Sequence, residues 1–247
     1  MKNAPEADFL NMWTRIRRSG LQNELLIRAA KPERQRAAKG AEVVTATDVR
    51  LTAIDATAGF GEDAFLLAAA GYDVTMYERN PAVAAVLRDA LSCAAAAEAA
   101  ETAGRLKFGG AESGFRDVIA RMHLVESDST AAMQAMVTQV SRETSSDGDA
   151  GNEPKASADD STMRIDVIYL DPMFPDAGKS ALSKKKLQFI KEQQVSAADE
   201  EALLQAALAL RPRKIIIKRP LKGPFLCGVT PGYSIKGKLI RYDCIVL

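Results

Sequence analysis

Residues 51–70 read LTAIDATAGFGEDAFLLAAA, and this stretch decides the fold class. An apolar strand pattern ends at Asp55, a turn with two glycines follows, and a run of alanine, leucine and phenylalanine then indicates a helix. Strand, tight turn and helix in this order form the first unit of a doubly wound α/β sheet. Glycines let the backbone approach a ligand closely, so Asp55, Gly59 and Gly61 are candidate residues of a nucleotide-cofactor site.

The glycine turn does not match the phosphate-binding motifs. Gly59-Phe-Gly61 lacks the third glycine of the dinucleotide fingerprint, and no Lys-Ser/Thr pair follows it as a P-loop requires. A second strand pattern, Tyr72–Tyr77, ends in Glu78, which lies 23 residues after Asp55. An acid at that place can accept hydrogen bonds from both hydroxyls of a ribose. The pattern therefore favours a ribose-bearing cofactor and disfavours phosphate binding.

A third motif lies in residues 165–175, which read IDVIYLDPMFP. An apolar strand pattern over 165–170 is followed directly by an acid, a proline and an aromatic residue. Asp171 and the free carbonyl of Pro172 can offer two acceptors to one amino group. Phe174 can stack on the ring that carries the amine. These three residues are the candidate catalytic residues for chemistry on an exocyclic amine of a nucleic-acid base. The alternative interpretation is a strand that is simply stopped by prolines.

The 247 residues suit one large α/β domain with an appendage. The chain has no run of 18 apolar residues, and its first residues lack the apolar core of a signal peptide, so we expect a cytoplasmic protein without a membrane partner. Cys93, Cys227 and Cys244 have no metal-like spacing, and a histidine triad or zinc site would have to be built on the single His123. We expect no metal.

The net charge of +1 is unevenly distributed along the chain. Residues 1–50 carry 10 Lys/Arg against 6 Asp/Glu, residues 51–170 carry 9 against 19, and residues 171–247 carry 14 against 7. An acidic centre suits a cationic or neutral cofactor, and basic ends suit a polyanion. Solvated surface charge explains part of this pattern without any function.

Basic residues cluster downstream of the Asp171 turn. The segment 179–186 contains four lysines, and two further basic residues end the next strand pattern. Their common place beside the candidate catalytic turn predicts an RNA-binding rim, although a run of lysines is usually a solvated helix face. The candidate RNA-binding residues are Lys179, Lys184, Lys185, Lys218 and Arg219.

Alternating patterns along the chain predict a mostly parallel, doubly wound sheet with a C-terminal antiparallel hairpin. The predicted strands are 51–54, 72–77, 122–125, 165–170 and 214–218, with hairpin strands 233–236 and 239–246. One predicted helix starts at residue 63, and three others span residues 81–103, 130–140 and 199–210. Residues 1–48 form a small N-terminal helical extension, residues 49–247 form the α/β domain, and the polar stretch 141–162 is predicted to be a disordered insertion.

Together these motifs resemble the bacterial small-subunit ribosomal RNA guanine-N2 methyltransferases, which modify 16S RNA near its 3′ end. The resemblance covers about Arg18 to Arg241. Its most specific stretches are DATAGFGEDAF from Asp55, YERNP from Tyr77, LDPMFP from Leu170, KSALSKK from Lys179 and KRP from Lys218. It implies a Rossmann-like class I methyltransferase, S-adenosylmethionine as cofactor, and 16S ribosomal RNA or the small ribosomal subunit as partner.

The resemblance also assigns cofactor contacts to residues that follow the strand ends. The family usually has Gly-Arg-Asp where this chain has Gly61-Glu-Asp, so the aspartate is the firmer expectation of that pair. The implied reaction is methylation of the guanine N2 amine. The cofactor positions carried over are Glu62, Asp63, Glu78, Arg79, Asp128, Ser129 and Asp171.

Three other functions fit parts of the sequence. An Asp-Pro-aromatic turn would also serve an adenine-N6 methyltransferase acting on RNA or DNA. A nicotinamide-dependent oxidoreductase is weakened by the missing third glycine. A non-catalytic RNA-binding protein would explain the basic ends but not the conjunction of Glu78, Asp171 and the glycine turn.

Overall fold

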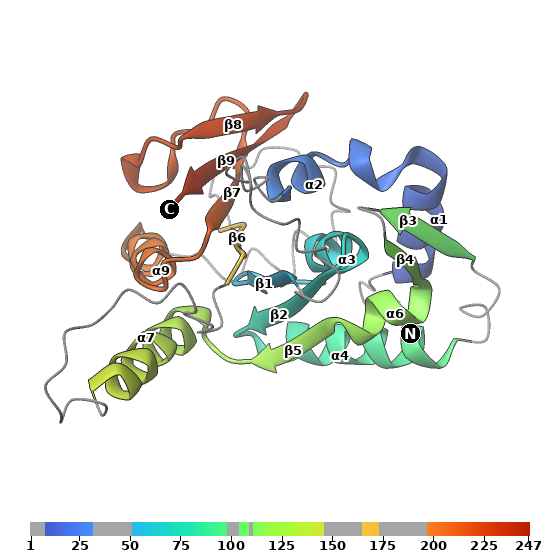
Figure 1. The fold of residues 1–247 in the computed structure, drawn as a ribbon, viewed down its shortest axis with the longest axis horizontal. Helices are drawn as coiled ribbons and strands as arrows, with labels where there is room; N and C mark the ends of the chain where they lie inside the picture. Colours follow the sequence, from blue (N-terminus) through green and yellow to red (C-terminus); the bar gives the residue numbers. More distant parts are fainter. Residues whose placement is uncertain (1–7, 32–50, 98–103, 109–110, 146–164, 173–196) are drawn as a thin grey trace, which may run out of the picture.

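The computed structural model describes residues 8–31, 51–97, 104–108, 111–145, 165–172 and 197–247. Its main sheet has seven strands in the order β5-β2-β1-β6-β7-β9-β8 (Figure 1). The first five strands of this order are parallel, and β9 and β8 continue the sheet antiparallel. The strands are β1 Leu51–Asp55, β2 Tyr72–Glu78, β5 Met122–Glu126, β6 Val167–Leu170, β7 Lys214–Pro220, β8 Tyr233–Lys236 and β9 Ile240–Val246. The predicted mostly parallel sheet with a terminal hairpin is confirmed.

Helices cover both faces of this sheet (Figure 1). One face carries α3 Glu62–Ala69, α4 Pro81–Ala96 and α6 Phe115–Ala120, and the other carries α7 Ser129–Ser145 and α9 Ala197–Ala209. Buried strand residues alternate between the two faces: Val167 and Tyr169 pack on the α3 side, whereas Ile168 and Leu170 pack on the α9 side. This double burial explains the continuous apolar runs of the parallel strands.

The start of α4 shows how local sequence sets an element boundary. Asn80 is the N-cap residue, and its Oδ1 accepts hydrogen bonds from Ala82 N at 2.8 Å and Val83 N at 3.4 Å. Pro81 occupies the first helical position, where its missing N–H costs nothing. Because α4 begins so soon after β2, the loop between them is short, and Glu78 at the end of β2 lies only two residues before the N-cap Asn80.

The N-terminal segment packs against the α3 face of the sheet. It consists of α1 Phe9–Ser19, the 3-10 turn η1 Leu21–Asn23 and α2 Leu25–Ala30. The Phe9 ring stacks on the ring of Phe65 of α3, with 5.3 Å between the ring centroids. The fully buried Trp13 packs edge-on against Phe115 of α6, with a centroid distance of 5.9 Å. Lys214 Nζ in β7 donates to Ala29 O at 3.0 Å. These helices share one apolar core with the sheet, while residues 32–50 lie outside the described residues.

Two predicted boundaries differ from the structure. The helix predicted to reach residue 103 ends at Ala96, and a separate two-stranded sheet follows, β3 Arg105–Phe108 with β4 Ala111–Gly114. Leu106 and Phe108 alternate with two basic residues, a period-two signal that the prediction missed. The predicted disordered insertion also starts too early, because α7 continues to Ser145 on helix-favouring residues such as Arg142. Residues 146–164 lie outside the described residues.

The sheet order reverses between β1 and β6, so the C-terminal ends of these two strands form the topological switch point. Ligands of doubly wound sheets bind at such a point. Asp55 ends β1, and Asp171 directly follows β6. In the described part of the chain, the structure has no helix with the length and apolar character needed to cross a membrane.

Candidate active site

The glycine turn after β1 has two positions that a side chain would disturb. Gly59 has φ +53° and Gly61 has φ +75°, a region that favours glycine. A Cβ at Gly61 would lie 2.8 Å from Leu87 Cδ1, so a side chain there would have to displace Leu87 of α4 as well as adopt the unfavourable φ. At Gly59 a Cβ would meet only Thr57 O, at 3.9 Å, among the described residues beyond its chain neighbours. The turn is thus packed at Gly61 and open at Gly59.

Glu78 is fixed at the end of β2 by two backbone donors. Its Oε2 accepts from Gly59 N at 2.9 Å, and its Oε1 accepts from Asn80 N at 2.8 Å. Burial raises the pKa of Glu78, and these two hydrogen bonds oppose that shift. Each carboxylate oxygen has a second lone pair, so both can still accept a hydroxyl hydrogen. The carboxylate links the open glycine turn to the end of the neighbouring strand.

The other predicted cofactor residues lie at the same edge of the sheet. Asp128 Oδ1 accepts from Ala131 N at 3.0 Å at the start of α7, and Arg79 Nη1 is 3.8 Å from Asp128 Oδ2. Ser129 is buried as the first residue of α7, and Glu62 is exposed as the first residue of α3. An exposed pair such as Arg79–Asp128 contributes little to stability.

Asp63 and Asp171 share a lysine. Lys218 Nζ lies 2.8 Å from Asp63 Oδ2 and 3.0 Å from Asp171 Oδ2. Tyr169 OH donates to the same Asp63 oxygen at 2.7 Å. These contacts bring together the first turn of α3, β6 and β7. The predicted cofactor acid Asp63 and the predicted catalytic acid Asp171 therefore belong to one polar network.

Asp171 also contacts the glycine turn. Its backbone N donates to Thr57 Oγ1 at 2.8 Å, and its side chain is 35% exposed. Burial raises the pKa of Asp171, while the charge of Lys218 opposes that shift. Pro172 is buried next to it. A partly exposed carboxylate thus lies at the switch point, one hydrogen bond from the candidate cofactor turn.

Asp55 has a different environment from the other acids. It is 1% exposed beneath the turn, and its Oδ1 accepts from Thr57 N at 3.1 Å. Burial raises the pKa of Asp55 to about 8, and the charges of Asp63 and Asp171 add to this effect. Burial thus favours the protonated form of Asp55, which supports the turn through its hydrogen bond with Thr57 N.

The RNA-binding prediction is not supported for Lys218 and Arg219. Lys218 is engaged with two carboxylates, and Arg219 is 3% exposed with its Nε donating to Pro224 O at 3.0 Å. Successive strand residues point to opposite faces. The Lys218 side chain therefore points toward α3, and the Arg219 side chain contacts the loop after β7. The remaining predicted residues, Phe174, Lys179, Lys184 and Lys185, lie outside the described residues.

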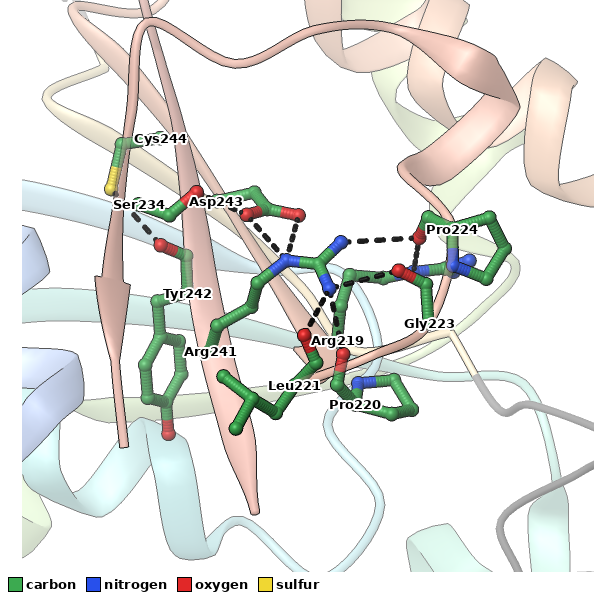
Figure 2. Close-up of polar contacts among 10 residues, drawn as sticks. All are labelled: Arg219, Pro220, Leu221, Gly223, Pro224, Ser234, Arg241, Tyr242, Asp243 and Cys244. Carbon is green, nitrogen blue, oxygen red and sulfur yellow. Dashed lines mark hydrogen bonds and ion pairs between the residues drawn. The ribbon is translucent and has the colours of Figure 1, made fainter. Parts of the chain in front are cut away.

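A buried arginine that the sequence analysis did not identify organises the same edge of the sheet (Figure 2). Arg241 Nε in β9 donates to Asp243 Oδ1 at 2.9 Å and Oδ2 at 3.1 Å. Its Nη atoms donate to four carbonyls of the loop after β7, those of Pro220, Leu221, Gly223 and Pro224, at 2.8–3.3 Å. Arg241 and Asp243 are two residues apart on a predicted strand, a spacing that places both on one face and signals such a pair.

The residues at this edge fit S-adenosylmethionine. Gly59 leaves room at the turn, Glu78 offers two fixed acceptors for ribose hydroxyls, and the carboxylates of Asp63 and Asp171 suit a cationic sulfonium. Within the described ranges, no group of three or more His, Cys, Asp or Glu side chains is arranged to hold a metal ion.

Sheet order, glycine turn and strand-end acids together define the Rossmann-like fold of class I methyltransferases. The chain belongs to the family described as "Putative SAM-dependent methyltransferase", whose model matches residues 4–144 and 149–247. A crystal structure of a SAM-dependent methyltransferase from Neisseria gonorrhoeae is 25% identical, with a TM-score of 0.63 over 100% of this chain and 76% of that one.

Curated relatives share a common name. The Ribosomal RNA small subunit methyltransferase J of Pseudomonas aeruginosa is 38% identical over 195 residues, which are 79% of this chain and 60% of the relative. The protein of the same name from Hydrogenovibrio crunogenus is 35% identical over 192 residues, which are 78% of this chain and 56% of the relative. The chain thus spans somewhat less than two thirds of the length of these relatives.

Proposed function

We propose that this protein transfers the methyl group of S-adenosylmethionine to the exocyclic N2 amine of a guanine in 16S ribosomal RNA. The observation that carries the proposal is the position of Asp171, at the switch point and one hydrogen bond from the glycine turn. The relatives named for the small-subunit ribosomal RNA support the substrate class. The choice of guanine N2 rests on the resemblance of residues 170–175, and the cytoplasmic location goes with a ribosomal substrate.

In this proposal the cofactor half of the site is the edge formed by β1 and β2. Glu78 accepts the ribose hydroxyls, and the open backbone at Gly59 lets the nucleoside approach. Asp63, Arg79, Asp128 and the neighbouring residues Glu62 and Ser129 complete the surroundings, with Asp55 supporting the turn from below. When bound, the cofactor supplies an electrophilic methyl group on a sulfonium.

The protein's contribution to chemistry is then mainly positioning. The guanine N2 lone pair is delocalised into the ring, and accepting its hydrogens at Asp171 and at the Pro172 carbonyl favours attack while it fixes the nitrogen. The N–C bond would form as the C–S bond breaks, with the sulfur keeping the electron pair, and the amine would then lose one proton to the ionised Asp171 carboxylate. Near-attack positioning of this kind can contribute roughly 7 to 11 kcal/mol. Phe174 is proposed to stack on the guanine.

The experiment that tests this function maps methyl groups on ribosomal RNA by mass spectrometry. Cells lacking the protein should lose one methyl group on a guanine of 16S RNA. Wild-type protein should restore it, and Asp171→Ala should not. The Asp171→Ala protein should keep a wild-type melting temperature, because a partly exposed carboxylate contributes little to core packing. An unchanged methylation map in cells lacking the protein would contradict the proposal.

A further inference from the structure

Lys218 joins the two acids to which the proposed function gives different tasks. Its Nζ lies 2.8 Å from Asp63 Oδ2 on α3 and 3.0 Å from Asp171 Oδ2 after β6. The Lys218 side chain is only 25% exposed. A lysine ammonium has three hydrogen-bond donors, and two of them are directed here at carboxylates from different elements.

Strand geometry brings this lysine to the site. β6 and β7 are parallel neighbours, with Leu170 opposite Ile217, so Lys218 is level with Asp171. Ile216 packs on the α3 side of β7, and a strand repeats its direction every two residues. Lys218 therefore turns toward α3, as Tyr169 of β6 and Asp171, the residue after β6, also do. The strand pairing therefore fixes the position of Lys218, which is not an exposed surface lysine.

We propose that Lys218 is a positioning residue for methyl transfer, which holds the Asp171 carboxylate through Oδ2 and leaves Oδ1 to accept hydrogens of the target amine. This inference rests on the proposed function for the identity of that amine. Among the described residues, no hydrogen bond occupies Asp171 Oδ1. Tyr169 OH donates to the same Asp63 oxygen that Lys218 contacts, so the second carboxylate partner of the lysine is itself held in place.

Charge gives Lys218 a second effect on Asp171. Burial raises the pKa of that carboxyl, and Lys218 is the strongest opposing charge. A protonated Asp171 would donate a hydrogen bond instead of accepting one, and it could not take up the proton that the amine loses after methyl transfer. Lys218 thus keeps Asp171 in the form that the reaction needs. Among the described residues, the ionisable groups around Asp171 are Asp55 of β1, Asp63 of α3, Tyr169 of β6, Lys218 and Arg219 of β7, and Tyr242 of β9.

The test compares Lys218→Met with Lys218→Arg and with a matched surface variant, Lys222→Gln. Lys222 is exposed in the loop that follows β7. For Lys218→Met we expect kcat to fall on the order of 10²-fold, the effect of misplacing a reacting group, with little change in the KM for RNA. The acidic limb of its pH–rate profile should move to higher pH, because Asp171 loses the cation that favours its ionised form.

The two control variants separate charge from geometry. Lys218→Arg should keep the acidic limb of the wild type, because it keeps the charge, but should have a lower kcat because its planar fork cannot reproduce the same two contacts. Lys222→Gln should keep the wild-type kcat and acidic limb. If Lys218→Met instead raises KM, flattens the salt dependence of RNA binding and leaves kcat and the acidic limb unchanged, Lys218 contacts RNA and the proposal is overturned.

A measurement without RNA or cofactor keeps the inference separate from the proposed function. The Asp171 carboxyl carbon can be titrated by ¹³C NMR in the wild type and in Lys218→Met, with Asp171→Asn assigning the signal. We expect a higher titration midpoint in Lys218→Met, and equal midpoints would overturn the proposal. Should Lys218→Met fail to fold, the same titration in Lys218→Gln applies. Absence of methyl transfer by the wild type would contradict the proposed function and leave this titration valid.

Discussion

At the scale of single residues, Glu78 is the side chain on which the proposed cofactor site depends most. Glu78→Ala should weaken S-adenosylmethionine binding by about 1.5–3 kcal/mol, the range for hydrogen bonds to charged groups, because it removes both acceptors for the ribose hydroxyls. Isothermal titration calorimetry measures this loss. Asp73→Asn, at the opposite end of β2, should bind the cofactor as the wild type does. Wild-type affinity in Glu78→Ala would remove this residue from the cofactor site.

Asp55 makes a prediction about stability and pH. Burial raises its pKa from 3.8 to about 8, so between these values the folded protein binds more protons than the unfolded chain. The contribution of Asp55 to stability is therefore greatest at low pH and is lost as the pH rises through about 8. Asp55→Asn keeps an Oδ1 acceptor for the Thr57 N–H but does not titrate.

Urea unfolding of the wild type and Asp55→Asn tests this linkage. We expect the free energy of unfolding of Asp55→Asn, relative to that of the wild type, to increase between about pH 5 and about pH 9. The difference between the two proteins isolates Asp55 from other groups that titrate in this range. A difference that stays constant over the whole range would show that Asp55 has an ordinary pKa in the folded protein.

At the scale of elements, Arg241 connects β9 to the loop after β7. The guanidinium and the Asp243 carboxylate are both buried, at 4% and 2% exposed. Arg241→Met should lower the free energy of unfolding by about 3–5 kcal/mol, because it leaves a buried carboxylate without its charge partner. The double variant Arg241→Met/Asp243→Leu should recover part of that loss. A loss below about 1 kcal/mol for Arg241→Met would show that this ion pair contributes no more than a pair on the surface.

The elements show what the sequence could and could not predict. The strands of the main sheet were predictable because β1, β6 and β7 are buried on both faces and have continuous apolar runs. The acids at their ends were predictable because strand ends of a doubly wound sheet converge on one edge. The β3–β4 sheet was missed because each strand has only four residues, so the alternation over residues 105–108 is a weak signal beside the long alanine-rich helix pattern before it.

The sequence alone could not predict which side chains contact each other across neighbouring strands. Lys218 is part of a basic run in the sequence, and only the parallel pairing of β6 with β7 shows that it faces Asp171. Arg219, the next residue, turns the other way and is buried. The available signal was a lysine directly after the apolar core Ile215–Ile217 of the strand, because a charge at such a place requires a partner.

At the scale of the whole molecule, the basic C-terminal third is proposed to hold RNA beside the pocket. If Lys184 and Lys185 contact phosphates, Lys184→Gln/Lys185→Gln should raise the KM for 16S RNA. It should also reduce the slope of log affinity against log salt by roughly 1.4. Affinity for S-adenosylmethionine should not change. The matched control is Lys236→Gln/Lys238→Gln, two exposed lysines at the β8–β9 turn. Equal salt slopes for the two double variants would show that residues 184 and 185 are solvated surface.

The proposed reaction is methyl transfer to a guanine amine at the edge where Glu78 and Asp171 lie. Its most direct test incubates the purified protein with 16S ribosomal RNA or small ribosomal subunits and S-adenosylmethionine carrying a deuterated methyl group. The RNA is then digested to nucleosides for mass spectrometry. The proposed reaction predicts deuterated N2-methylguanosine, which should be absent when Asp171→Ala replaces the wild type. Deuterated N6-methyladenosine, or no deuterated nucleoside with either substrate, would contradict it.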